Sequence, residues 1–237
     1  MRLHYCEPRG VKHVLGTYTN AVQKENGYID YINLKDDDTN YYADLFIDCT
    51  GFNSVLHEKV LNVPFNSFSD ILINNKALAT SIPYTDKNVE METNTNATTM
   101  NAGWCWNIPL YNRIGTGYVY SSEFIDDDSA LKQFQKHLGT DEAEFKKIKM
   151  RVGLHENLWE KNVVAIGLSA GFIEPLESNG LFTTHEFLFK LVKALARDHV
   201  NKFDIDCYNM QNKWAFRNFA EFVGLHYALT GRDDTPY

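Results

Sequence analysis

The stretch VVAIGLSAGFIEPLESNG, residues 163–180, decides the fold. Val163–Gly167 is an uninterrupted apolar run, as expected for a strand that is covered on both faces. A glycine-containing turn follows, and residues 179–197 then carry apolar side chains near helical spacing. This order brings the backbone amides of a helix N-terminus to the end of a strand, where they can meet an anion or a polarised ring. We therefore predict an α/β fold with a ligand site at this turn.

The same turn contains the candidate catalytic and anion-binding residues. Glu177 directly precedes the predicted helix, and Ser178, Asn179 and Gly180 open it. A purely structural interpretation makes Ser178 or Asn179 an N-cap and Glu177 a first-turn charge favoured by the helix dipole. The functional interpretation gains weight because a proline, a glycine and a second glutamate, Glu174, share the same short turn.

Two further segments can contribute to a site. In ADLFIDCTGF, residues 43–52, an apolar strand over residues 43–49 ends at a Thr-Gly pair, and Gly51 lets the backbone approach a ligand closely. In GWCWNIP, residues 103–109, Trp104 and Trp106 project from the same face of a strand. Taken singly, the first is also typical of an ordinary strand and turn, and the second of core packing.

Local patterns predict the remaining elements. The N-terminal residues 1–9 read as a helix that ends at Gly10. Asn26-Gly27 predicts a hairpin between extended segments at 11–25 and 28–34. Asp126–Asp128 caps a helix that ends at Gly139. Further strands are expected at 71–80, 98–108, 114–121 and 145–152, a polar surface loop at 84–96, and a last helix at 205–227.

Composition excludes several classes of protein. The chain has 237 residues, with 23 Lys and Arg against 31 Asp and Glu, so a net charge of −8 argues against nucleic acid as a partner. The N-terminus lacks the apolar segment of a signal peptide, and the longest mostly apolar stretch, 163–173, is too short to cross a bilayer. The four cysteines form no CxxC pair, which favours reduced, buried thiols in a cytoplasmic protein without a metal site.

Three sets of residues are more typical of ordinary structural roles than of catalytic, metal-binding or substrate-binding sites. The histidines are scattered without metal-ligand spacing. The acidic triplets at 36–38 and 126–128 are typical of solvated turns or caps. The aromatic residues of the last predicted helix are typical of a helix core rather than a substrate cage. The residues concerned are His57, His155, His185, His226, Trp214, Phe216, Phe219, Phe222 and Tyr227.

Taken together, these motifs resemble the flavin-dependent tryptophan halogenase family. GWCWNIP matches the family's W-x-W-x-I-P signature, here Trp104, Trp106, Ile108 and Pro109. FIEPLESNG is similar to its F-x-E-P-L-E-S-T-G turn. The family-like segments, which cover nearly the whole chain in one order, also include ADLFIDCTGF, RIGTGYVYSS (113–122), RVGLHENLWEKNVVAIGLSAGF (151–172) and HYALTGRDDTP (226–236).

The resemblance implies a fold and a chemistry. The fold is the two-dinucleotide-binding, glutathione-reductase-like flavoprotein fold, with FAD in one groove, the organic substrate in another pocket, and a tunnel between them. Reduced FAD from a separate flavin reductase, O2 and chloride or bromide produce a hypohalous acid, which reacts with tryptophan or another electron-rich aromatic molecule. Homodimers are common in the family.

The resemblance also implies residue roles. Glu177 would orient the electrophile or take the ring proton, and Ser178 would link the flavin and substrate sites. Asn179 and Gly180 would hold the halide through backbone N–H groups. The indoles of Trp104 and Trp106 would shield the flavin from the substrate. The residues implied to lie along the cofactor are Tyr18, Gly51, Trp104, Trp106, Leu168 and Leu181.

Departures from the family pattern limit what this chain does alone. The N-terminal G-x-G-x-x-G and the catalytic lysine are absent, and Asn179 stands where the family has a threonine. We expect a central fragment that is inactive by itself, with residues 1–200 forming a partial FAD-binding core, including the sheet over the flavin, and 201–237 beginning the helical substrate region. A non-catalytic flavin-binding remnant, or a single-component flavin monooxygenase or reductase of the same fold, remain as alternatives.

Overall fold

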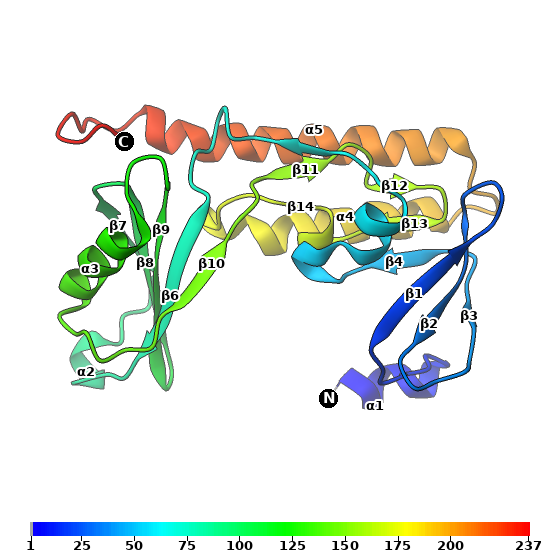
Figure 1. Cartoon of the computed structure of the whole chain (residues 1–237), viewed down its shortest axis with the longest axis horizontal. Coiled ribbons are helices and arrows are strands. Elements are labelled where there is room, and N and C mark those ends of the chain that lie inside the picture. Colours follow the sequence, from blue (N-terminus) through cyan, green and yellow to red (C-terminus); the bar gives the residue numbers. More distant parts are fainter. Residues whose placement is uncertain (1) are drawn as a thin grey trace.

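The computed structural model describes the backbone of residues 2–237, and the side chains of residues 4–176 and 178–237. Two sheet-bearing ends are joined by two long helices that run side by side (Figure 1). These helices are α4 (Asn179–Leu195) and α5 (Lys202–Ala228). The five-stranded sheet and α3 lie at one end, and a three-stranded sheet lies at the other (Figure 1).

The strands form four sheets, and their order shows which segments meet. The five-stranded sheet has the order β10-β6-β9-β8-β7, and the others have the orders β1-β2-β3, β14-β11-β5 and β12-β13-β4. The strands are β1 (Tyr18–Gln23), β2 (Ile29–Leu34), β3 (Tyr41–Tyr42), β4 (Phe46–Asp48), β5 (Phe65–Ser67), β6 (Lys76–Ile82), β7 (Asn96–Met100), β8 (Gly103–Leu110), β9 (Arg113–Tyr120), β10 (Lys146–Lys149), β11 (Gly153–His155), β12 (Trp159–Glu160), β13 (Val163–Ala165) and β14 (Gly171–Phe172). The shorter helices are α1 (Arg2–Cys6), α2 (Lys87–Glu90) and α3 (Asp127–Leu138).

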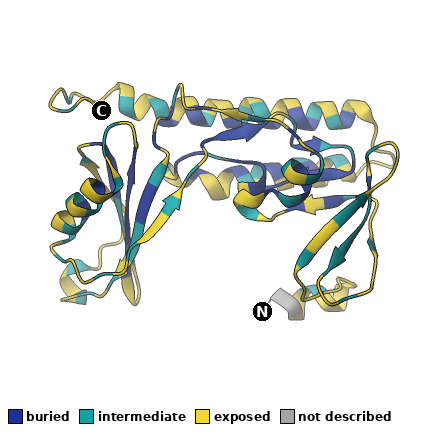
Figure 2. Ribbon diagram, in the orientation of Figure 1, coloured by how far each residue is buried: buried dark blue, intermediate teal, exposed yellow. Residues whose placement is uncertain are grey.

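The predicted buried strand is confirmed as β13. Its residues are fully buried, and it lies between antiparallel β12 and parallel β4. Val164 and Ala165 belong to the largest buried cluster, to which α4 contributes Phe187 and α5 contributes Phe216 and Val223. Figure 2 shows buried segments in the middle of the molecule, below α5 in this view. The strand that leads into the turn at residues 167–178 is therefore held from both faces.

The end caps and the hairpin follow the local patterns. Asp126 accepts hydrogen bonds from the backbone N–H groups of Asp128 and Ser129, and Gly139 ends α3 in the left-handed conformation. β1 and β2 pair antiparallel around the turn at Asn26-Gly27. The helix before Gly10 is present over the described residues and ends in a 3₁₀ turn; Met1, which that prediction included, lies outside them.

Three predictions about secondary structure and burial are wrong in detail. The single strand expected at 98–108 is two strands, β7 and β8, because Asn101 and Ala102 form a turn that lacks an Asn-Gly signal. Residues 11–17 of the extended segment expected at 11–25 form no strand, since they pair with no neighbouring strand, and all of them are exposed. Cys49 is exposed rather than buried, because it follows the last residue of β4, where alternation turns its side chain outward. All four cysteines are free.

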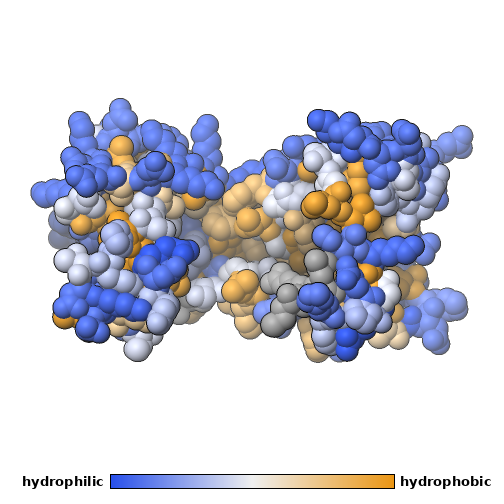
Figure 3. Space-filling model, turned by 90° about the horizontal axis from the view of Figure 1, so that it is seen from below, coloured by the Kyte–Doolittle hydropathy of each residue, from blue (hydrophilic) through white to orange (hydrophobic). Residues whose placement is uncertain are grey.

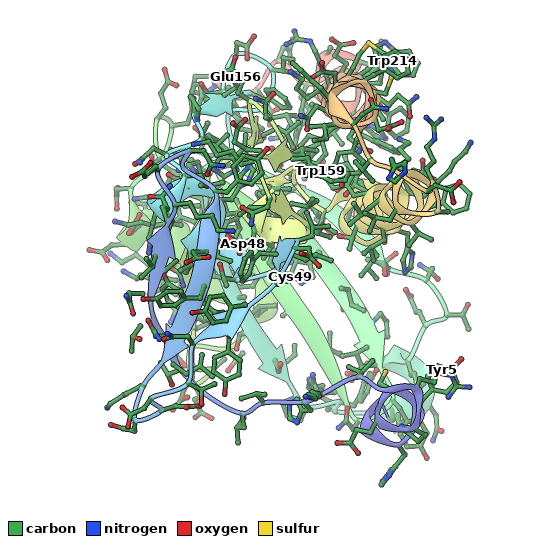
Figure 4. The ribbon with its side chains drawn as sticks, turned by 90° about the vertical axis from the view of Figure 1, so that its right-hand side faces the viewer. Tyr5, Asp48, Cys49, Glu156, Trp159 and Trp214 are labelled. Atoms are coloured by element: carbon green, nitrogen blue, oxygen red, sulfur yellow. The ribbon has the colours of Figure 1, made fainter. Side chains whose placement is uncertain are left out.

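The aromatic residues of α5 divide between core and surface. Phe216 is buried, whereas Trp214 is 70% exposed and projects outward from α5 (Figure 4). A helix-core role is therefore wrong for Trp214 and for the half-exposed Phe222. Apolar side chains also gather at the narrow middle of the molecule, between its two wider ends (Figure 3). No helix within residues 2–237 is both long and apolar enough to cross a membrane.

Candidate active site

A cavity of about 700 Å³ lies where β8, the turn after β13 and the start of α4 meet. This size falls within the range typical of small-molecule sites. Its walls come from segments far apart in the sequence. They include Trp104, Trp106, Ile108, Gly167, Leu168, Phe172, Pro175, Leu176, Ser178, Asn179, Gly180, Leu181 and Phe216.

The paired indoles form one wall of this cavity. Trp104 and Trp106 stand two residues apart on β8, and their ring centroids lie 6.2 Å apart. The ring of Trp106 lies over Gly117 of the neighbouring strand β9, occupying the space that a Cβ would need. Trp104 is almost fully buried and belongs to a cluster with Val119 and Leu176. The indole wall is therefore fixed from behind by the sheet.

The start of α4 faces the same cavity without a side-chain cap. Ser178 occupies the N-cap position with φ of 56° and makes no capping hydrogen bond through its hydroxyl. The amide of Asn179 instead donates to the carbonyl oxygens of Glu174 and Leu176, at 2.7 and 2.9 Å. The expectation that Ser178 or Asn179 caps the helix through its side chain is therefore wrong, because the Ser178 hydroxyl makes no capping bond and the Asn179 amide is bound to two backbone carbonyl oxygens. The first turn of a helix leaves its N–H groups without intrahelical partners, and the residues of this helix start line the cavity.

Gly180 is exposed at this helix start, and a Cβ at this position would have no atom within 4 Å. A small anion can therefore approach the backbone there. Glu177 lies in the turn Leu176–Ser178 that leads into α4; its side chain lies outside the described residues. Of the residues implied to lie along the cofactor, the structure brings Leu168 and Leu181 to the cavity beside the two indoles.

Gly51 and Tyr18 do not line this cavity. Gly51 has φ of 71° and open space over its Cα, and its carbonyl oxygen accepts a hydrogen bond of 3.2 Å from the hydroxyl of Ser169. The end of β4 and the turn after β13 are therefore neighbours. Tyr18 packs against a separate buried cluster that includes Phe46 of β4.

Comparisons with known proteins place the chain in a family. A sequence model of the tryptophan halogenase family matches residues 3–237. The chain belongs to the tryptophan halogenase family. It is 37% identical over 235 residues to the 7-chloro-L-tryptophan 6-halogenase KtzR of Kutzneria sp. (strain 744), a match that covers 98% of this chain and 45% of KtzR.

Solved structures show the same fold. The VirX1 apo structure superposes with a TM-score of 0.94 at 44% identity, covering 98% of this chain and 45% of that chain. The tryptophan 6-halogenase SttH of Streptomyces toxytricini gives a TM-score of 0.93 at 38% identity, covering 99% and 46%. The chain thus spans just under half the length of these relatives, and the fold is that of flavin-dependent halogenases, in incomplete form.

Two of the buried carboxylates among the described residues lie in the motif segments, and sequence patterns do not predict their contacts. Asp48 ends β4 and accepts hydrogen bonds from the backbone N–H groups of Thr50, Leu56 and His57 (Figure 4 labels Asp48). Burial alone would raise the pKa of Asp48, but these bonds and one from the Thr50 hydroxyl lower it. Asp48 therefore shapes the turn that carries Gly51. The short apolar strand ending in Asp-Cys-Thr-Gly was the available signal.

The second is Glu174, which is fully buried within the turn of the halogenase motif. From the sequence it is only one of two glutamates in a short turn. The structure places its side chain behind the indole wall, where it accepts a hydrogen bond of 3.1 Å from the ring nitrogen of Trp104. The motif glutamates at 174 and 177 therefore occupy different positions in the turn, one of them behind the cavity wall.

The histidines divide between the core and the surface. His57 and His155 are buried with ring centroids 5.2 Å apart, and His185 and His226 are exposed. Burial lowers the pKa of His57 to about 4, although a hydrogen bond to the carbonyl of Asn157 opposes this shift. Within residues 4–176 and 178–237, no three acidic, histidine or cysteine side chains gather as metal ligands would.

Proposed function

We propose that this chain forms the central part of a flavin-dependent halogenase that acts on tryptophan or another indole-like aromatic molecule. The observation that carries the proposal is the cavity itself: the indoles of Trp104 and Trp106 form one side, and the uncapped start of α4 forms another. Family membership supports it, since the relatives KtzR and SttH are tryptophan halogenases by name. The whole protein's substrate, cofactor and partners are part of this proposal.

The halide would lie at the start of α4. The backbone N–H groups of Asn179 and Gly180 would donate hydrogen bonds to the halide, and the positive end of the helix dipole would attract it. These groups suit a small anion better than a lysine or arginine side chain, which could hold the anion in a tight ion pair. The family's threonine hydroxyl is absent, and the Asn179 amide is occupied by two backbone carbonyls. Halide binding would therefore depend on the backbone alone.

The residues present also fit a flavin. Gly51 and Gly180 leave backbone open to a planar ring, and Leu168 and Leu181 are exposed apolar side chains at the cavity. FAD in its reduced form would supply the two electrons that, with O2 and a proton, convert chloride or bromide to hypohalous acid and water. We place the cofactor contacts in residues 1–200, with Tyr18 toward the adenine end, and the start of the substrate region in residues 201–237. A separate flavin reductase would supply the reduced cofactor.

The protein's own groups would then control the electrophile. Trp104 and Trp106 would keep the aromatic substrate away from the flavin, so that the halogenating species reaches the ring and direct contact of the substrate with the cofactor is excluded. The carboxylate of Glu177 would orient the electrophile or accept the ring proton that the halogen replaces, as a carboxylate near a developing cation can. Ser178 would connect the two halves of the site.

The test is a halogenation assay on the complete gene product, with FAD, a flavin reductase, NADH, O2 and chloride or bromide, against a panel of indoles. We expect one halogen per product molecule. Glu177→Gln should reduce turnover by about 100-fold, within the range for a lost acid–base group, while FAD binding stays within twofold. Normal turnover in that variant would remove Glu177 from the mechanism. FAD binding without halide incorporation on any indole would favour a non-catalytic flavin-binding protein.

A further inference from the structure

Glu174 joins three distant parts of the chain through one carboxylate oxygen. Its Oε2 accepts hydrogen bonds from the ring nitrogen of Trp104 at 3.1 Å, the amide of Asn74 at 2.8 Å and the hydroxyl of Tyr227 at 2.5 Å. These donors belong to β8, the loop before β6, and the last turn of α5. The Asn74 amide also donates to the hydroxyl of Tyr237, 2.9 Å away.

This carboxylate is buried without a cationic partner among the described residues. Its side chain has no exposed surface, and none of the ion pairs there includes it. Burial raises the pKa of Glu174, and the three hydrogen bonds oppose that rise. Burying a carboxylate is costly unless it is well hydrogen-bonded, so an apolar residue of similar volume would serve packing better. A role in fixing its donors accounts for a carboxylate at this position.

The main chain of Glu174 faces the other side of the cavity. Its carbonyl oxygen accepts a hydrogen bond from the side-chain amide of Asn179, the first residue of α4. Ile173 and Pro175, which flank Glu174 in the sequence, line the cavity. The side chain therefore holds the indole wall, while the carbonyl holds the helix start. A single residue thus sets the separation of the two surfaces that the proposed function places around flavin and halide.

We propose that Glu174 is a positioning residue that fixes the indole of Trp104 relative to the backbone amides at the start of α4. Its effect on catalysis rests on the proposed function; the fixing of Trp104 does not. If the indole swings away, water enters the cavity and the hypohalous acid is lost before it reaches the aromatic ring. Glu174 would then be needed for coupling oxidation to halogenation, without touching substrate or cofactor.

The structural part is tested on this chain by NMR. The chain has four tryptophans, so the indole N–H signals are few, and Trp104→Phe assigns the signal of interest. We expect the Trp104 indole proton to exchange with solvent about 10-fold faster in Glu174→Leu, the upper end of the fold-change for losing one side-chain hydrogen bond. Glu174→Gln keeps an acceptor oxygen and should restore most of the protection. This variant keeps the proposal testable if Glu174→Leu fails to fold.

The matched control is Glu156→Leu, an exposed glutamate elsewhere on the chain, which should leave the Trp104 signal unchanged (Figure 4). Tyr227→Phe removes one donor and should change the exchange of Trp104 less than Glu174→Leu does. Unchanged exchange of the Trp104 proton in both Glu174 variants would overturn the proposal, because packing alone would then hold the indole.

The catalytic part is tested on the complete gene product by the ratio of halogenated indole to O2 consumed. Glu174→Leu should lower this ratio by about tenfold or more, with Glu174→Gln closer to the parent. A parent protein that never halogenates would refute the proposed function, yet the exchange measurement would still decide the role of Glu174. A parent that halogenates, with both variants fully coupled, would refute the catalytic part alone.

Discussion

A methyl group added at Gly117 tests the indole wall directly. A Cβ there would lie 2.1 Å from Cη2 of Trp106 and 2.6 Å from the carbonyl oxygen of Leu78. Carbon atoms in contact lie at about 3.5–4.0 Å, so the indole must move by more than ~1 Å. The Leu78 carbonyl belongs to β6, which is paired with β9 and cannot follow. We expect Gly117→Ala to displace the Trp106 ring into the cavity.

The expected loss of stability follows from this steric overlap. Forcing a methyl group into packed structure destabilises by about 1–3 kcal/mol, and the short distance to a backbone oxygen favours the upper end, about 3 kcal/mol. In a chain of this size each kcal/mol lowers Tm by about 2–4 °C, so Tm should fall by roughly 6–12 °C. Thermal unfolding measures this change, and near-ultraviolet circular dichroism reports the movement of the indole.

The matched control is Gly115→Ala, two residues earlier on the same face of β9. A Cβ there would lie 3.8 Å from the nearest atom, which is ordinary contact. Its Tm should stay within about 2 °C of the parent, because less chain entropy is lost from a strand on folding with alanine than with glycine. If the two variants unfold at the same temperature with the same dichroism, the Trp106 ring does not occupy the position described above, and the geometry of the wall is wrong.

Two further predictions concern pH and the helix start. The pKa of His57 is lowered by burial to about 4, below the 6.5 of an exposed histidine, so the unfolded chain takes up its proton first as the pH falls. The free energy of unfolding should therefore have its full value above pH 6.5 and fall by about 3 kcal/mol as the pH is lowered toward 4. Urea midpoints measure this fall. An equally steep fall in a His57→Gln variant would contradict the assignment to His57. Asn179→Asp replaces the side-chain N–H donor with an acceptor, so that the carbonyl oxygens of Glu174 and Leu176 lose their hydrogen bonds. We expect the free energy of unfolding to fall by about 3 kcal/mol. Denaturant unfolding checks this loss, with Asp206→Asn on the exposed face of α5 as the control that should not change.

Local signals alone predicted much of the fold. The hairpin at Asn26-Gly27, the cap at Asp126 and the left-handed ends at Gly10 and Gly139 depend on backbone geometry within a few residues, so the sequence specifies them directly. The turn between β7 and β8 was missed because Asn101 and Ala102 carry no glycine signal, and pairing with β9 rather than turn chemistry sets where the strand reverses.

The sequence by itself determined the family and the two indoles on one face of a strand, because motif order and the two-residue period of a strand are properties of the chain alone. Only the tertiary structure decided that these indoles face the start of α4 across a cavity, and that Asn179 turns its amide to backbone carbonyls. It also decided that Glu174 gathers Trp104, Asn74 and Tyr227 around one oxygen. These residues are 70, 100 and 53 positions away from Glu174, and no local pattern encodes a contact that the packing of separate elements creates.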